Sequence, residues 1–148
     1  MINCFDKEYA FLSNFFDSEI VDEDGICYPT VEHYFQAMKT LDKVVRFDIA
    51  ISTTPGQAKR KGRKVSLRPD WEQVKEQVMY DAIVQKFANE ELREKLLATG
   101  DEYLEEGTTW HDNEWGNCSC EKCQKIVGKN KLGKILMQVR SEIRDGKC

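Results

Sequence analysis

The sequence predicts a mainly α-helical fold: one compact, multihelical domain over residues 1–148 with a small β element near the N-terminus. Two observations support this prediction. Apolar residues recur at helical spacing in several segments, whereas one turn flanked by short apolar runs stands near the start of the chain. Neither a repeat nor a Pro/Gly/Ser-rich linker divides the 148 residues, a length typical of one domain.

The β element is expected in the segment IVDEDGICY. There Asp24-Gly25 lies between two short apolar runs, a pattern that predicts a β-hairpin. Pro29 follows, and Thr30 is placed to cap a helix that carries VEHYFQAMKTL. The face of this helix that suits the core comprises Tyr34, Ala37, Met38 and Leu41.

Three helices are expected in the middle of the chain. One runs from about Val44 to Ile51, and a short one through QAKRKG has Pro55 at its entrance, where the missing N–H costs little. Asp70 and Gln73 form a capping-box-like start for WEQVKEQVMYDAIVQKF. The apolar positions of this third helix are Val74, Val78, Met79, Ala82, Ile83 and Phe87.

Two more helices are expected toward the C-terminus. Asn89 opens the segment EELREKLLAT, and Gly100 is placed to end it. The last helix begins near Asn130, and Gly146 lies beyond its end. Its apolar stripe comprises Leu132, Ile135, Leu136, Val139 and Ile143.

Composition excludes several classes of protein. With 41% hydrophobic and 32% charged residues the chain is too apolar for disorder, and no apolar run is long enough to cross a bilayer. The start MINCFDKEYA lacks the pattern of a signal peptide, so we expect a cytoplasmic protein. The net charge of −4 argues against general nucleic-acid binding. The basic run 59–64 is either a solvated helix face or a phosphate contact.

The segment VEHYFQAMK carries one row of polar residues. On a helix Glu32, Gln36 and Lys39 share a face, since they are spaced i, i+4 and i+7. A carboxylate, an amide and an amine on one stripe fit a catalytic row. They also fit a solvated face, which is the more common arrangement.

A second group of candidates lies between predicted elements. Trp110, Asp112, Trp115 and Gly116 follow one another in a segment with few helix or strand signals. Two tryptophans around an acid indicate a packed loop that forms a pocket. The alternative is that both indoles fill the core while Asp112 caps a turn.

The N-terminal FLSNFF is a weaker candidate. Its Ser13 and Asn14 stand beside Phe15 and could offer hydrogen bonds next to an aromatic face, as a nucleobase or ribose site requires. A strand and turn that simply bury phenylalanines are the more common explanation of such a segment. Trp71 shares a stripe with Val74 and Val78, which favours a role in the core.

Cysteines suggest a metal, but weakly. Cys118, Cys120 and Cys123 supply three of the four ligands that structural zinc needs. The fourth ligand would come from His111, Cys148, Cys27 or Cys4. Because the sequence lacks a second paired ligand motif, these thiols are weak candidates for a structural zinc site.

Seven segments, in this order, resemble the NADAR family, also called YbiA-like. They run from about Phe5 to Arg140 and read FLSNFF, YPTVEHYFQAMK, PGQAKRKGR, LRPDWEQVKEQVM, KFANEELREKLLATGD, DNEWG and GKNKLGKILMQVR. The resemblance implies a mostly helical fold and N-glycosidase activity on ribosylated bases. Family substrates include early aminouracil intermediates of riboflavin synthesis and ADP-ribose attached to guanine.

The resemblance also implies roles for individual residues. The catalytic glutamate of the family falls on Glu32, its site tryptophan on Trp71, and the acid and tryptophan of D-x-x-W-G on Asp112 and Trp115. Lys39 matches the lysine that closes the helix motif. In place of the family's short glycine-rich loop, this chain has the insertion CSCEKC after Gly116.

We therefore expect an N-glycosidase that needs no cofactor or protein partner. Its substrate would be a small ribosylated base or ADP-ribosylated guanine, free or in DNA. Glu32 would act as general acid and base, Asp112 would hold the ribose, and Arg60 and Arg63 would contact a phosphate. The amine of Lys39 would attack C1 of the sugar. The alternatives are a non-catalytic module that binds ADP-ribose or an NAD derivative, and a zinc-clipped interaction domain.

Overall fold

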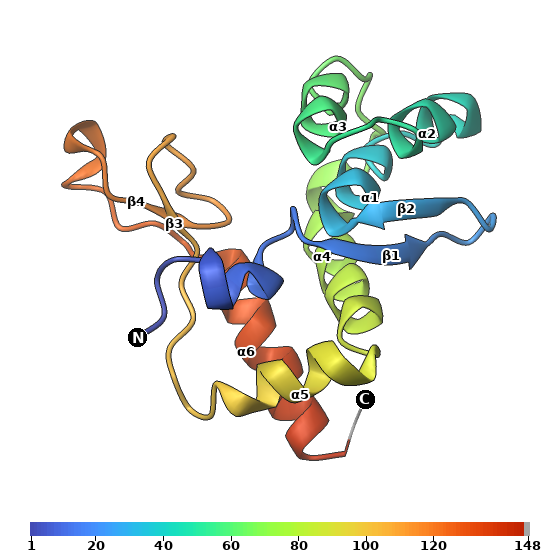
Figure 1. Ribbon diagram of the computed structural model, residues 1–148. Helices are drawn as coiled ribbons and strands as arrows, with labels where there is room; N and C mark the ends of the chain where they lie inside the picture. The colour runs from blue at the N-terminus through green and yellow to red at the C-terminus, as the bar shows by residue number, and fades with distance from the viewer. Residues whose placement is uncertain (147–148) are drawn as a thin grey trace. The chain divides into compact units, whose positions relative to one another are not determined.

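The computed structural model describes residues 1–146, which form two compact units (Figure 1). One unit comprises Asn14–Lys86, and the other comprises Met1–Ser13 together with the chain from Phe87 onward. Among the described residues, helices form most of the regular structure, and each unit contains one two-stranded sheet. The predicted mainly α-helical fold with a small N-terminal β element is confirmed.

In the unit Asn14–Lys86 a hairpin precedes four helices, with α1 at the centre of the unit. The helix α1 contacts both strands and all three of the other helices, as Figure 1 shows. Because these elements surround α1, every one of its residues is buried. The elements are β1 (Asp17–Val21), β2 (Cys27–Thr30), α1 (Val31–Ala37), α2 (Lys43–Ala50), α3 (Pro55–Gly62) and α4 (Trp71–Lys86).

The predicted hairpin forms as an antiparallel pair with the turn at Asp24-Gly25, where Gly25 has φ +82°. The sequence did not single out Asp22, which organises this turn. Its Oδ1 accepts hydrogen bonds from the amides of Asp24 and Ile26, and its Oδ2 accepts one from the Tyr28 hydroxyl at 2.7 Å. An aspartate that bonds the backbone two residues ahead is a common way to hold a tight turn.

The start of α1 is anchored by polar contacts. As predicted, Thr30 caps the helix: its Oγ1 accepts from the His33 amide at 3.1 Å. The buried His33 ring lies between the Thr30 hydroxyl and the Ser52 carbonyl, at 2.8 and 3.0 Å. Burial lowers the pKa of His33, so the neutral ring serves as a packing histidine.

One predicted core position of this helix is wrong. Tyr34, Ala37 and Met38 are buried, but Leu41 is 60% exposed. The reason is that α1 ends at Ala37, four residues before Leu41, so Leu41 is not part of the helix. Beyond Met38 the chain turns, so the 3.6-residue repeat no longer determines which side chains face the core.

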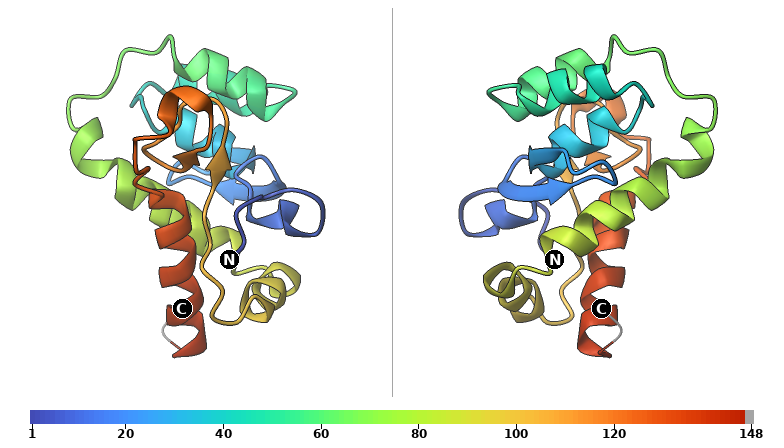
Figure 2. Two further views of the ribbon diagram at one scale, coloured as in Figure 1. Left: turned by 90° about the vertical axis from the view of Figure 1, so that its left-hand side faces the viewer. Right: turned by 90° about the vertical axis from the view of Figure 1, so that its right-hand side faces the viewer.

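The other unit is built around α5 (Glu90–Ala98) and α6 (Lys131–Arg144), which cross steeply, as Figures 1 and 2 show together. Asn89 caps α5 and Gly100 ends it with φ +62°, as predicted. The predicted stripe of α6 enters the core through Leu132, Ile135, Leu136 and Val139. The remaining elements are the 3-10 helices η1 (Lys7–Leu12) and η2 (Glu121–Cys123) and the parallel strands β3 (Gly107–Thr108) and β4 (Asn117–Cys118).

The segment FLSNFF begins in η1 and ends in a turn, so the expected strand is replaced by a 3-10 helix. Phe11 is buried against Phe87, with ring centroids 6.4 Å apart, whereas Phe15 is 47% exposed. Within residues 1–146, no helix combines the length and the apolar character that spanning a membrane requires.

Candidate functional site

Glu32 and Gln36 form the centre of the candidate site in the unit Asn14–Lys86. Gln36 Nε2 donates to Glu32 Oε1 at 3.2 Å, across one turn of α1. The two side chains are only 7% and 4% exposed. The alternative of a solvated face is therefore wrong for this pair. Removing a carboxylate from water costs free energy. A buried carboxylate is therefore characteristic of functional sites.

The burial of Gln36 depends on Gly62, the last residue of α3. A Cβ atom placed on Gly62 would stand 1.9 Å from Gln36 Oε1 and 2.9 Å from Gln36 Cβ. Only glycine allows α3 to approach α1 this closely. Gly62 thus makes room for a side chain of the candidate site.

Lys39 lies in the turn that follows α1. Its amide donates to the Gln36 carbonyl at 3.3 Å, and its carbonyl accepts from the Arg68 amide at 2.8 Å. Desolvation lowers the pKa of Lys39, the positive charges of Arg63 and Lys59 lower it further, and the Glu32 carboxylate opposes both effects. Lysines of lowered pKa are more often neutral and hence more nucleophilic.

Asn14 also belongs to this site. Its carbonyl accepts from the Glu32 amide at 3.1 Å, and its side chain, 8% exposed, donates to Met79 Sδ at 3.6 Å. Among the described residues, Asn14 Oδ1 and Gln36 Oε1 are the two buried side-chain atoms without a hydrogen-bond partner. Buried acceptors without a partner suit a ligand that donates hydrogen bonds to them. The neighbouring Ser13 is half-buried, and its amide donates to the Ala10 carbonyl.

Trp71 begins α4 and packs against α1. Its indole is 6% exposed, and its centroid lies 5.1 Å from that of Phe35 at an interplanar angle of 58°. This geometry agrees with the core role that its apolar stripe indicated. Trp71 therefore packs against the helix that carries Glu32, and its role in substrate binding stays a prediction.

The basic residues of α3 line a surface hollow of about 470 Å³ that includes Gln57, Lys61 and Lys64. Arg60 and Arg63 are both exposed and belong to its rim. Lys61 is partly neutralised by Asp48, at 3.4 Å. The stretch is therefore solvated, as its composition indicates, and it is also concave and positively charged.

In the other unit, Asp112 organises the loop that carries D-x-x-W-G. Its Oδ1 accepts from the amides of Glu114 and Trp115 at 3.1 and 2.9 Å, and its carbonyl accepts from Thr108 Oγ1. Asp112 thus caps a turn, as one of the two interpretations predicted. Trp115 is half-buried beneath the Lys131 ammonium, whereas Trp110 is 55% exposed and does not fill the core.

Gly116 is required by close packing within this loop. A Cβ atom there would lie 2.3 Å from the Glu106 carbonyl oxygen. Its own carbonyl accepts from the Asn130 amide at 3.1 Å, just before α6. The second glycine of the segment, Gly128, in turn packs on the Gly116 carbonyl. Gly116 therefore shapes the loop, and its substrate-binding role stays a prediction.

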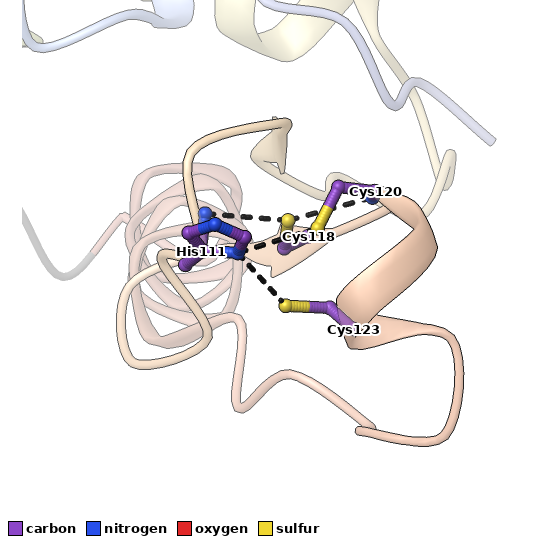
Figure 3. A group of neighbouring side chains, drawn as sticks. All are labelled: His111, Cys118, Cys120 and Cys123. Carbon is purple, nitrogen blue, oxygen red and sulfur yellow. Dashed lines mark hydrogen bonds between the residues drawn. The ribbon is translucent and has the colours of Figure 1, made fainter.

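The three cysteines of the insertion meet His111 (Figure 3). The imidazole Nδ1 lies 3.3 Å from the sulfurs of both Cys120 and Cys123, and the His111 amide donates to Cys118 Sγ at 3.3 Å. Desolvation would raise the pKa of Cys118, but hydrogen bonds from the Cys120 amide and thiol and from the His111 amide lower it to about 6. Cys4 and Cys27 are exposed, and Cys148 lies outside the described residues.

Comparison with known proteins identifies relatives over almost the whole chain. The NADAR domain profile matches residues 3–144. The N-glycosidase YbiA of Escherichia coli strain K12 is 44% identical over 139 residues, which cover 92% of this chain and 82% of that protein. The N-glycosidase Npun_R5314 of Nostoc punctiforme is 41% identical over 145 residues, with 94% and 88% covered.

Two further matches extend the comparison. The chloroplastic riboflavin biosynthesis protein PYRR of Zea mays is 36% identical over 152 residues, covering 91% of this chain but 23% of that protein. The NMR structure of E. coli YbiA superimposes with a TM-score of 0.82 at 40% identity and covers 99% of this chain and 87% of the other. Because the matching profile, the identity and the fold agree over nearly the full length, the chain belongs to the NADAR family.

Proposed function

We propose that this chain is an N-glycosidase that hydrolyses the bond between C1 of a ribose and a nitrogen of a ribosylated base. The observation that carries the proposal is a buried carboxylate, Glu32, on the same short segment as the half-buried Lys39, whose pKa is lowered. A proton donor for the departing base and an amine that attacks C1 can together carry out this cleavage. The names of the relatives from E. coli and Nostoc punctiforme support the reaction class.

Glu32 is proposed as the general acid and base. Cleavage of the C1–N bond passes through a state with oxocarbenium character, and the departing base nitrogen must receive a proton. The hydrogen bond from Gln36 Nε2 holds one carboxyl oxygen of Glu32 in place at 3.2 Å. After the base has left, the Glu32 carboxylate accepts a proton from the incoming water.

Lys39 is proposed as the nucleophile. Its neutral amine attacks C1, the electron pair of the C1–N bond passes to the base nitrogen, and Glu32 protonates that nitrogen. The lysine nitrogen then gives up a proton, and its lone pair opens the sugar ring; the ring oxygen takes up a proton, and a protonated imine forms. Addition of water to the imine releases the ribose as an aldehyde and restores the lysine. The lowered pKa of Lys39 supports the first of these steps.

Asp112 and Trp115 are proposed to act on the ribose and the base, a role that rests on the family resemblance. The turn uses Asp112 Oδ1 as its acceptor, so Oδ2 is the oxygen we assign to a sugar hydroxyl. Asp112→Asn keeps an oxygen for the turn and removes the charge. An Asp112→Asn variant that folds normally but keeps wild-type kcat would exclude a catalytic role for this carboxylate.

A phosphorylated substrate is favoured by the hollow on α3. Arg60 and Arg63 are exposed on its rim, and Arg63 acts electrostatically on Lys39. Guanidinium groups bind phosphate through paired hydrogen bonds. A ribose 5-phosphate and the diphosphate of ADP-ribose both satisfy this requirement, so the aminouracil ribosides and ADP-ribosylated guanine are both proposed as substrate classes.

The test is to incubate the full chain with each substrate class and to measure released base by chromatography. The substrates are a phosphorylated ribosylaminouracil, an ADP-ribosylated guanine nucleotide and the same modified guanine in single-stranded DNA. Release by wild type but not by Glu32→Gln supports the proposal. Binding of ADP-ribose without release from any substrate would instead favour a non-catalytic binding module.

A further inference from the structure

We infer that His111, Cys118, Cys120 and Cys123 bind one structural Zn²⁺ ion. One potential ligand atom from each residue lies within 4.8 Å of the other three (Figure 3). The set of one imidazole and three thiols is a common donor set of structural zinc sites, which are closed by four protein ligands. The sequence offered four residues as the fourth zinc ligand. Of these, the structure places His111 beside the three cysteines.

The distances fit a tetrahedral ion. Zinc–sulfur and zinc–nitrogen bonds of standard length place two sulfurs about 3.8 Å apart and a nitrogen about 3.6 Å from each sulfur. His111 Nδ1 lies 3.3 Å from the sulfurs of Cys120 and Cys123, close to the second value. Even the widest separation, 4.8 Å, needs a contraction of only about 1 Å to reach the first value.

The backbone of His111 is consistent with a ligand role. Its φ of +68° lies in the left-handed region, which non-glycine residues occupy rarely and at a cost of about 1–3 kcal/mol. This conformation directs both the amide and the ring of His111 toward the cysteines: the amide donates to Cys118 Sγ, while Nδ1 contacts the other two sulfurs. A zinc bond supplies a reason for the strain.

Further hydrogen bonds surround the sulfurs as a second layer. Asn113 Nδ2 donates to Cys123 Sγ at 3.4 Å, and the Cys120 amide donates to Cys118 Sγ at 3.5 Å. Asn113 Oδ1 also accepts from the Cys118 amide at 2.9 Å. Donors aimed at sulfur stabilise metal-bound thiolates, and such outer contacts tune metal affinity. Asn113 therefore joins the metal ligands to the loop that carries Asp112.

The surrounding segment has no hydrophobic core of its own to replace the metal. Among residues 109–129, three are buried: Gly116, Cys118 and Cys123. Three large apolar side chains of this stretch are exposed, with Trp110 at 55%, Ile126 at 51% and Val127 at 92%, and Trp115 is half-buried. Small segments that cannot bury apolar surface are commonly held together by a metal, whose binding energy becomes folding energy.

The site is independent of the proposed glycosidase reaction, and its test measures zinc alone. The full chain is purified without a metal-binding tag and kept reduced, and its metal content is measured by elemental mass spectrometry. We expect one zinc ion per chain. Titration of the metal-free protein with Co²⁺ should produce the visible bands of tetrahedral, thiolate-bound cobalt. Wild type that holds no zinc and gives no cobalt spectrum would overturn the inference.

Variants assign the ligands. Cys120→Ser should lower zinc affinity more than 100-fold in competition with a chelator, and Asn113→Ala about 10- to 100-fold, as second-layer changes do. The matched controls Cys4→Ser, Cys27→Ser and Cys148→Ser should keep one zinc. Circular dichroism separates loss of zinc from loss of the helical fold. Equal zinc content in Cys120→Ser and in these controls would contradict the assignment.

Discussion

The substitution Gly62→Ala tests whether the contact between α3 and α1 holds the candidate site together. The added Cβ would lie 1.9 Å from Gln36 Oε1, 2.7 Å from its Cδ and 2.9 Å from its Cβ. Carbon atoms in contact prefer about 3.5–4.0 Å, so the Gln36 amide must move by roughly 1.5 Å. Rotating the amide is not enough, because Gln36 Cβ is also too close. The two helices must therefore separate, and the hydrogen bond from Gln36 to Glu32 is lost.

The size of the effect follows from two opposing contributions. Overpacking a closely fitted contact costs about 1–3 kcal/mol. Alanine is the better helix former by up to about 1 kcal/mol, although this gain is reduced at the end of a helix. The net destabilisation is about 0.5–2 kcal/mol, or a fall in Tm of roughly 2–8 °C for a chain of this length. A lost hydrogen bond to a charged group, about 1.5–3 kcal/mol, corresponds to a roughly 10- to 100-fold fall in kcat.

Gly56→Ala is the matched control on the same helix. A Cβ at Gly56 would meet its nearest atoms at 3.8 and 3.9 Å, which are ordinary contacts. We expect unchanged activity and an equal or higher Tm for this variant. Thermal unfolding and base release are measured for both variants beside the wild type. If Gly62→Ala matches Gly56→Ala in both assays, the close approach of α3 does not support the site, and the reasoning is refuted.

Four further predictions concern the chemistry. Glu32→Gln should lower kcat about 10²- to 10⁴-fold with an unchanged Tm, because an amide cannot donate the proton that the leaving base needs; near-normal turnover would remove Glu32 from that role. Activity should fall as the pH drops below the lowered pKa of Lys39, since a protonated amine cannot attack C1. Borohydride added during turnover should trap an adduct in wild type but not in Lys39→Arg, and full activity of the latter excludes the imine. Arg60→Glu with Arg63→Glu should raise KM about 10-fold or more for a phosphorylated substrate, whereas Lys134→Glu on α6 should not; equal KM values would place the phosphate elsewhere.

Local signals predicted much of the fold because they act within a few residues. The hairpin at Asp24-Gly25, the Thr30 cap, the Asn89 cap and the αL residue Gly100 all occur where the sequence placed them. Each of them depends on a backbone geometry that one side chain, or the lack of one, favours directly. The error at Leu41 came from extending a periodic pattern past the true end of the helix.

The candidate site was predicted less completely. The family resemblance assigned site roles to Glu32, Trp71 and Asp112, and Lys39 was assigned by its place in the same motif; these roles stay predictions. Periodicity favoured a solvated face for Glu32 and Gln36, because it reports which residues share a face and not what covers that face. Asn14 was noticed beside phenylalanines, but its contact with the Glu32 amide joins residues far apart in sequence. Asn113, now placed beside the cysteine sulfurs, has no sequence signal of its own.

By itself the sequence determined the class of fold, the order of the helices and the residues capable of acid–base and thiol chemistry. Only the tertiary structure decided that Gln36 is covered by Gly62 and that His111, rather than another ligand, meets the cysteines. The physical reason is the range of the interactions. Capping, turn formation and amphipathicity are set within a few residues, whereas burial, pKa shifts and metal geometry depend on which distant segments the folded chain brings into contact.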